Sequence, residues 1–122
     1  MTLIKVKTTE LIGPALDWAV AKVEGFIDDP ESWLYGAGLG RIMAGTFRPS
    51  TDWSQGGPLI DKMGGFELKV WLESKPETKC EAHIHNYDGN WIVFGPTPLV
   101  AAMRCLVAAK LGDTVQVPKE LR

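Results

Sequence analysis

The stretch of residues 97–112, TPLVAAMRCLVAAKLG, decides the fold of this chain. Thr97 suits the N-cap of a helix because its hydroxyl can accept a hydrogen bond from a free N–H of the first turn, and Pro98 suits the first helical position. Gly112 follows the last periodic residue, where a left-handed conformation commonly ends a helix. Nearly every residue between these ends is apolar, and such a helix is buried or lies in an interface. The pattern predicts a core helix over residues 98–111.

The composition is that of an ordinary globular protein. The chain has 122 residues, of which 45% are hydrophobic and 23% are charged, so we expect a single domain over residues 1–122. The formal net charge of −2 argues against a general nucleic-acid binder, which normally carries a basic excess. The first ten residues contain no uninterrupted apolar stretch, so we expect no signal peptide and no membrane insertion. Cys80 and Cys105 are expected to be free thiols in a reducing compartment.

The period of the apolar residues changes to two from Phe66 onward. Residues 66–73 (FELKVWLE) and 80–85 (CEAHIH) alternate between apolar and polar side chains, and residues 90–95 (NWIVFG) predict a third strand. An Asp-Gly pair before this third strand is typical of a hairpin turn. These patterns predict an antiparallel meander with one apolar face, which the helix over residues 98–111 can cover.

Two further elements are predicted near the N-terminus. Residues 2–7 (TLIKVK) alternate imperfectly and predict a first strand. Residues 13–24 carry apolar side chains at helical spacing, and Gly25 stops the helix that they predict. The predicted fold class is therefore α+β: a three- or four-stranded, mainly antiparallel sheet packed on one face by the buried C-terminal helix, with a second, N-terminal helix beside it.

The remaining segments are less regular. Residues 26–49 are rich in glycine and predict a loop with one short strand near residues 41–47. Pro58 is expected to start a short helix that a pair of glycines stops. Residues 113–122 predict an extended tail.

Several long runs resemble the NinX-like family of small proteins encoded by bacteriophages and prophages. They are ALDWAVAK at 15–22, STDWSQGGPLI at 50–60, GPTPLVAAMRC at 95–105 and KLGD at 110–113. The resemblance implies a phage-encoded protein made in the host bacterial cytoplasm. Because the family is one of uncharacterised function, the resemblance implies no reaction and no catalytic residues.

The first candidate site is a loop that combines hydroxyls, a carboxylate, an indole and glycines: Ser50, Thr51, Asp52, Trp53, Gly56 and Gly57. A ring of a small polar ligand, such as a nucleotide or a base, can stack on Trp53 while hydroxyls and amides bind its polar part. In the alternative interpretation Asp52 or Ser50 caps the following turn and Trp53 packs in the core. The match of this loop to the family favours the functional interpretation.

Arg104 is the second candidate because it is a charge within an apolar helix. A buried guanidinium needs a partner, and it can pair with Asp17 or Asp52 or bind a phosphate or carboxylate of a ligand. The alternative is a surface arginine whose stem lies along the helix. Asp17 and Trp18 form the third candidate, in which Asp17 orients Arg104 or a ligand. Its alternative is a surface carboxylate beside a half-buried indole.

His83 and His85 share one strand face with Glu81. Two such histidines can bind zinc, but no second cluster of histidine or cysteine completes the ligand set, so a polar solvent face is expected. Cys105 lies among apolar residues, which raise the pKa of a thiol. Since no nucleophile–base–acid set is present, we expect no enzymatic activity, no metal and no cofactor.

The sequence thus predicts a non-enzymatic phage accessory protein that binds a small polar or nucleotide-like ligand. Asp17, Asp52, Trp53 and Arg104 are expected to line one shared cleft. The alternative is an interaction protein that docks on a host or phage protein without a ligand pocket. A homo-oligomer is also expected, because one small sheet cannot cover a helix that is apolar on nearly every side.

Overall fold

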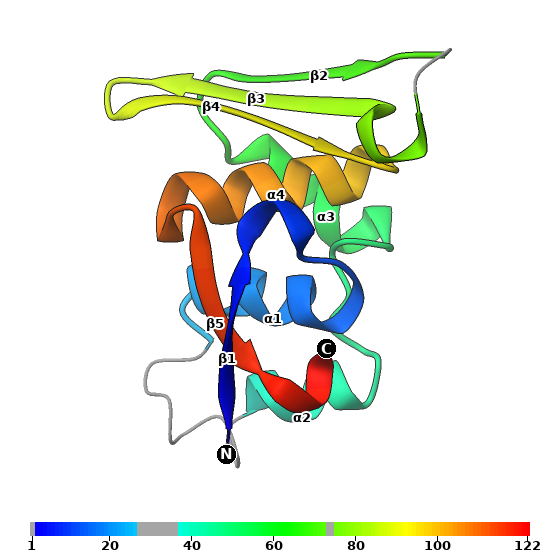
Figure 1. The fold of residues 1–122 in the computed structure, drawn as a ribbon, viewed down its shortest axis with the longest axis vertical. Coiled ribbons are helices and arrows are strands. Elements are labelled where there is room, and N and C mark those ends of the chain that lie inside the picture. The colour runs from blue at the N-terminus through cyan, green and yellow to red at the C-terminus, as the bar shows by residue number, and fades with distance from the viewer. Residues whose placement is uncertain (1, 27–36, 73–74) are drawn as a thin grey trace.

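The computed structural model describes residues 2–26, 37–72 and 75–122 (Figure 1). The strands are β1 (Leu3–Lys7), β2 (Phe66–Val70), β3 (Cys80–Asn86), β4 (Gly89–Gly95) and β5 (Thr114–Pro118). The helices are α1 (Gly13–Val23), α2 (Ala37–Met43), α3 (Trp53–Asp61) and α4 (Pro98–Leu111). Short 3₁₀ turns are η1 (Thr8–Glu10), η3 (Pro76–Thr78) and η4 (Lys119–Leu121). None of the described helices has the length and hydrophobicity needed to span a membrane.

Helix α4 forms the middle layer of the molecule. In Figure 1 the sheet of β2, β3 and β4 lies on one side of α4, and α1, α2 and the β1–β5 pair lie on the other. Residues 99–108 are all buried. The Thr97 hydroxyl caps the helix by accepting a hydrogen bond from the Val100 amide at 3.1 Å, and Gly112 ends it with a φ of 99°. The predicted core helix over residues 98–111 is confirmed.

Strand β3 is the centre of the main sheet and pairs antiparallel with β2 and with β4. Its alternation follows the prediction, because Cys80, Ala82 and Ile84 are buried in a cluster shared with α4. The end of β4 lies so close to α4 that a Cβ on Gly95 would be 2.7 Å from the Ala101 amide nitrogen. The predicted α+β fold, with the C-terminal helix against one face of an antiparallel sheet, is confirmed.

The segment predicted as an extended tail is a paired strand. Strand β5 pairs antiparallel with β1, so that Val115 lies opposite Val6 and Val117 lies opposite Ile4. The two strands form a separate sheet, and β1 is therefore not a fourth strand of the main sheet. Burial of Val6, Val115 and Val117 stabilises this pairing through the hydrophobic effect.

Two local predictions are wrong. The short strand expected near residues 41–47 is instead the end of α2 followed by turn and loop; residues 27–36 of the predicted loop lie outside the described residues. Helix α3 begins before Pro58, because the Asp52 carboxylate caps it by accepting a hydrogen bond from the Ser54 amide at 2.9 Å. Pro58 therefore lies inside the helix, where it removes one backbone N–H.

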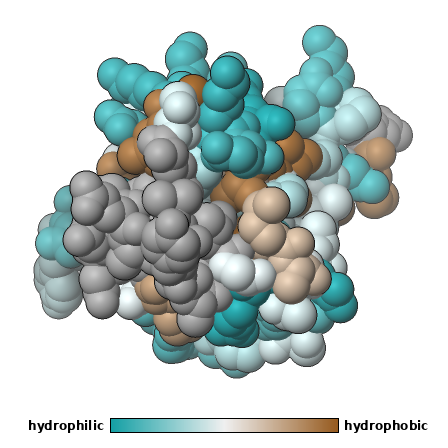
Figure 2. Space-filling view, turned by 90° about the horizontal axis from the view of Figure 1, so that it is seen from below, coloured by the Kyte–Doolittle hydropathy of each residue, from teal (hydrophilic) through white to brown (hydrophobic). Residues whose placement is uncertain are grey.

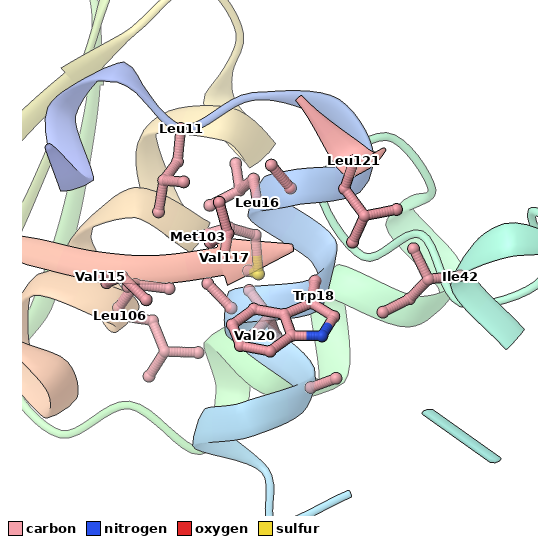
Figure 3. Packing of buried hydrophobic residues seen from close by; sticks show 14 of the residues in the cluster. Leu11, Leu16, Trp18, Val20, Ile42, Met103, Leu106, Val115, Val117 and Leu121 are labelled. Atoms are coloured by element: carbon pink, nitrogen blue, oxygen red, sulfur yellow. The ribbon is translucent and has the colours of Figure 1, made fainter. Parts of the chain in front are cut away.

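The main hydrophobic core lies between α4, α1 and the β1–β5 pair. Trp18, Val20, Met103 and Val117 point into this cluster (Figure 3). A smaller cluster lies between α4 and the main sheet. Seen from below, the coloured surface is hydrophilic along much of its upper and lower edges, and hydrophobic areas lie between these edges and at the right of the view (Figure 2). Because α4 is covered on both sides within one chain, its apolar surface gives no reason to expect an oligomer through this helix.

Candidate functional site

Asp17 is a buried acceptor on α1 that holds the segment before α3. Its Oδ1 accepts a hydrogen bond from the Ser50 amide at 2.9 Å. Burial raises the pKa of the Asp17 carboxyl, and the hydrogen bond from the Ser50 amide offsets part of this rise. The carboxylate thus links α1 to the segment before α3 through a buried hydrogen bond.

Arg104 is buried in the middle of α4, with only 8% of the residue exposed. Its Nε donates a hydrogen bond to the Leu11 carbonyl at 2.7 Å, and its Nη1 donates one to the Phe94 carbonyl at 3.0 Å. No carboxylate of a described residue lies within ion-pair distance of it, and burial lowers the pKa of its guanidinium. Arg104 therefore holds the segment before α1 and strand β4 against α4, and it pairs with neither of the predicted carboxylates.

Asp52 caps α3, as the alternative interpretation of this loop expects. Its Oδ1 accepts hydrogen bonds from the Ser54 amide at 2.9 Å and from the Ser54 hydroxyl at 2.7 Å. These bonds lower the pKa of the Asp52 carboxyl. Arg48 lies nearby, with its Nε 3.6 Å from Oδ2 of Asp52. The carboxylate is thus occupied by contacts within its own segment.

Trp53 lines a hollow beside the N-terminal end of α4, which we call the Trp53 hollow. This hollow has a volume of about 400 Å³ and is lined by Ile12, Gly13, Ser50, Thr51, Trp53 and residues 96–100. Trp53 is 55% exposed, so its indole does not pack in the core. The indole is available to a partner at the surface.

The two glycines of this segment serve different purposes. A Cβ on Gly56 would lie 2.5 Å from the Pro49 carbonyl oxygen and 2.7 Å from a methyl group of Leu99. A Cβ on Gly57 would meet no atom within 4 Å. Gly56 therefore allows α3 to pack closely on the start of α4, whereas Gly57 has no such role, and neither lines the Trp53 hollow.

The structure brings together part of the predicted site. Ser50, Thr51 and Trp53 line one hollow. Of the four residues expected to share one cleft, Trp53 alone lines it. Trp18 is enclosed in the main core (Figure 3), and Arg104 faces backbone carbonyls. The charged groups of the predicted site thus stabilise the fold around the hollow.

A second hollow lies near the C-terminal end of α4, beneath the β3–β4 hairpin. It has a volume of about 370 Å³. Its apolar lining consists of Val23, Leu59, Met63, Ile84, Trp91, Leu106 and Ala109. Its polar lining consists of Glu24, Lys62, Asn86, Asp88 and Lys110. We call it the Trp91 hollow; apolar walls with a few polar groups are typical of small-molecule sites.

The hairpin turn and one ion pair shape the Trp91 hollow. A Cβ on Gly89 would lie 3.1 Å from the Trp91 ring, so the turn packs directly against the indole. Lys62 at the end of α3 lies 2.7 Å from the Glu24 carboxylate at the end of α1. Lys110 and Asp88 are exposed at the rim and form no ion pair with another described residue.

The Trp91 hollow was not predicted from the sequence. Its lining comes from α1, α3, α4 and the β3–β4 hairpin, and periodicity assigns a face to each element without saying where those faces meet. The available signal was Trp91, which lies opposite Ile84 in the register and so faces the inner side of the sheet. Trp91 lies far in the sequence from the predicted loop site, so the sequence alone did not connect it with a binding site.

The histidines lie on the outer side of the main sheet, as expected. The rings of His83 and His85 stack with centroids 6.0 Å apart, and Nδ1 of His83 is 3.7 Å from the Glu67 carboxylate. Within the described part of the chain, no three His, Cys, Asp or Glu side chains are grouped to hold a metal. Burial raises the pKa of the Cys105 thiol to about 11 and also raises that of Cys80. Neither thiol is activated as a nucleophile.

Comparison with known proteins identifies a family of phage proteins that matches the chain. Residues 7–110 match the family described as bacteriophage P22 NinX. The match includes α1, α3, the whole main sheet and most of α4, and it includes every residue that lines either hollow. No curated protein matches the chain.

Proposed function

The chain belongs to the bacteriophage P22 NinX family, and from this premise we propose that it is a non-enzymatic phage accessory protein that binds a small ring-bearing ligand. The ligand class is a flat ring with a polar edge, such as the base of a nucleoside or nucleotide. The site is the Trp91 hollow, and the protein acts in the cytoplasm of the host. The observation that carries the proposal is the apolar lining of this hollow beneath a polar rim.

The size and lining of the hollow support a ring as the bound group. Its volume of about 370 Å³ is near the lower end of the range for small-molecule sites, which suits a base with its sugar. The Trp91 indole offers an aromatic wall, and stacking on an aromatic side chain contributes about 1–3 kcal/mol per base. Leu59 of α3 and Met63, just after this helix, add apolar side chains to the lining.

The rim supports recognition of a polar edge. Because Lys62 and Glu24 neutralise each other, Lys110 and Asp88 are the charged groups of this rim without an ion-pair partner among the described residues. Asp88 can accept a hydrogen bond from a ring N–H, and Lys110 can bind a phosphate. Comparing nucleosides with nucleoside monophosphates therefore measures the contribution of Lys110.

Isothermal titration with the four common nucleosides and their monophosphates tests this proposal. We expect saturable binding of at least one compound, and Trp91→Ala should weaken it by about ten- to more than a hundredfold through lost stacking. Lys110→Glu, on an exposed side chain, should weaken a monophosphate more than its nucleoside.

Trp53→Ala is the matched control, because Trp53 lines only the other hollow and its removal should leave the affinity unchanged. Loss of binding in Trp53→Ala with normal binding in Trp91→Ala would instead assign the ligand to the Trp53 hollow. Absence of saturable binding by any of these compounds would contradict the proposed ligand class.

A second candidate function is docking on a host or phage protein through the Trp53 hollow. The observation that favours it is that Ile12 and Trp53, each 55% exposed, line the same shallow hollow. Large exposed apolar side chains that share a surface are typical of protein-binding sites. In this case Trp53→Ala would weaken partner binding, and the titrations with nucleosides would show no heat of binding.

A further inference from the structure

The outer face of the main sheet is the surface of this molecule that its proposed function leaves unexplained. We define it by Glu67 and Lys69 on β2, Glu81 and His83 on β3, and Ile92 and Phe94 on β4. These residues alternate with the inward residues that pack on α4. In Figure 1 the sheet is the outermost layer, and no described element lies over this face.

The outer face carries more apolar surface than a solvated sheet face normally does. Ile92 is 48% exposed and Phe94 is 40% exposed, and Trp71, just beyond β2, is 47% exposed. The solvent face of an antiparallel sheet is usually polar. Exposed aromatic and aliphatic side chains mixed with a few charges are typical of protein interfaces.

The register arranges the outer face in two rows across the strands. One row is Lys69, Glu81 and Phe94, and the next is Glu67, His83 and Ile92. In each row the β2 position is charged, the β3 position is polar and the β4 position is apolar. On β2 the two rows carry opposite charges, on β3 they pair a carboxylate with an imidazole, and on β4 both carry an apolar side chain.

We propose that a second copy of this chain docks on this face, with the two outer faces packed together. The two copies are related by a two-fold axis that lies between the packed faces, perpendicular to the strands and midway between the two rows. A rotation of 180° about this axis exchanges the rows. Lys69 then lies opposite Glu67 of the second copy, Glu81 lies opposite His83, and Phe94 lies opposite Ile92. Each contact occurs twice, as a two-fold interface requires, and the packed sheets form a β-sandwich.

The charges on this face disfavour a nucleic acid as its occupant. The face holds two carboxylates, Glu67 and Glu81, against the single lysine Lys69, and the whole chain has a net charge of −2. A phosphate backbone needs a basic excess. A protein surface of the same mixed charge meets no such repulsion. The outer face of a second copy is such a surface, because the exchange of rows places opposite charges against each other.

The expected dimer is a weak one. Three short strands provide an interface near or below about 1,200 Å² of buried surface, the lower end for specific complexes. We therefore expect a dissociation constant in the micromolar range and a dimer that forms without unfolding either copy.

Sedimentation equilibrium of the full chain tests the proposal through its charge pairs. Lys69→Glu places glutamate opposite Glu67 twice, and Glu67→Lys places lysine opposite Lys69 twice. Each variant should therefore weaken the dimer by about tenfold or more. A mixture of the two variants should dimerise as tightly as the wild-type chain, because both contacts between positions 67 and 69 in the mixed dimer again join a glutamate to a lysine.

The matched control is Lys5→Glu, which changes an exposed charge on β1 and should leave the dimer unchanged. Circular dichroism of each variant checks that it is folded. A wild-type chain that stays monomeric at several hundred micromolar would overturn the proposal. A mixture that associates no more tightly than its separate components would also overturn it, as would binding of a single-stranded oligonucleotide to this face in place of a second copy.

Discussion

Replacing Arg104 with alanine should destabilise the fold to about the extent of a core substitution. The change leaves the carbonyls of Leu11 and Phe94 without their present hydrogen-bond donors. A hydrogen bond from a charged donor contributes about 1.5–3 kcal/mol, and the burial that lowers the pKa of Arg104 offsets part of the two bonds. We therefore expect a loss of about 2–4 kcal/mol in the free energy of unfolding.

Thermal and urea unfolding followed by circular dichroism measure this loss. For a chain of this size, 1 kcal/mol corresponds to about 4 °C in the melting temperature, so the midpoint should fall by about 8–16 °C. Arg104→Lys keeps the charge but lacks the planar guanidinium that reaches two carbonyls. This variant should therefore lose an intermediate amount of the free energy of unfolding. Lys110→Ala, on an exposed side chain of the same helix, should change the stability by less than about 0.5 kcal/mol. If Arg104→Ala were as mild as Lys110→Ala, the role assigned to the buried guanidinium would be refuted.

Three further predictions concern the surroundings of the site. Because burial raises the pKa of Asp17, the native state binds the carboxyl proton more tightly than the unfolded chain does. The contribution of Asp17 to stability therefore falls as the pH rises from about 4 through the raised pKa. Asp17→Asn keeps an acceptor for the Ser50 amide without this charge, so its melting temperature should rise relative to wild type over that pH window; a constant difference would contradict the assignment. Gly56→Ala should destabilise the fold by about 1–3 kcal/mol through overpacking, whereas Gly57→Ala should stabilise it by up to about 1 kcal/mol, and equal melting temperatures would refute the close approach at Gly56. The Cys105 thiol, with its pKa of about 11, should react with a thiol reagent at pH 8 only as fast as the chain unfolds, and rapid labelling of the native protein would show that the thiol is accessible.

The elements that carry their own end signals were predictable from the sequence. Thr97, Pro98 and Gly112 mark the ends of α4, and the alternation of Cys80, Ala82 and Ile84 places β3 on the core. These signals act between near neighbours in the chain. Strand β5 lacks such a signal, because what makes it a strand is β1 at the other end of the sequence.

The candidate site was less predictable because it depends on long-range partners. Arg104 was recognisable as a charge that needs partners, yet its partners are backbone carbonyls, which no side-chain pattern reveals. Trp18 and Trp53 both follow an aspartate, but the first is enclosed and the second is exposed. The difference arises because Trp18 lies in the middle of α1 and packs into the main core, while Trp53 begins a helix at the surface.

An NMR titration that follows the indole N–H signals shows in which hollow a ligand binds, because it reports each tryptophan separately. When nucleosides and nucleoside monophosphates are added to the isotopically labelled chain, we expect saturable shifts at Trp91 and at amides of the β3–β4 hairpin and the end of α3. The Trp53 indole should not move. Saturable shifts at Trp53 and Ile12 with an unchanged Trp91, or no saturable shift at millimolar concentrations of any compound, would contradict ligand binding in the Trp91 hollow.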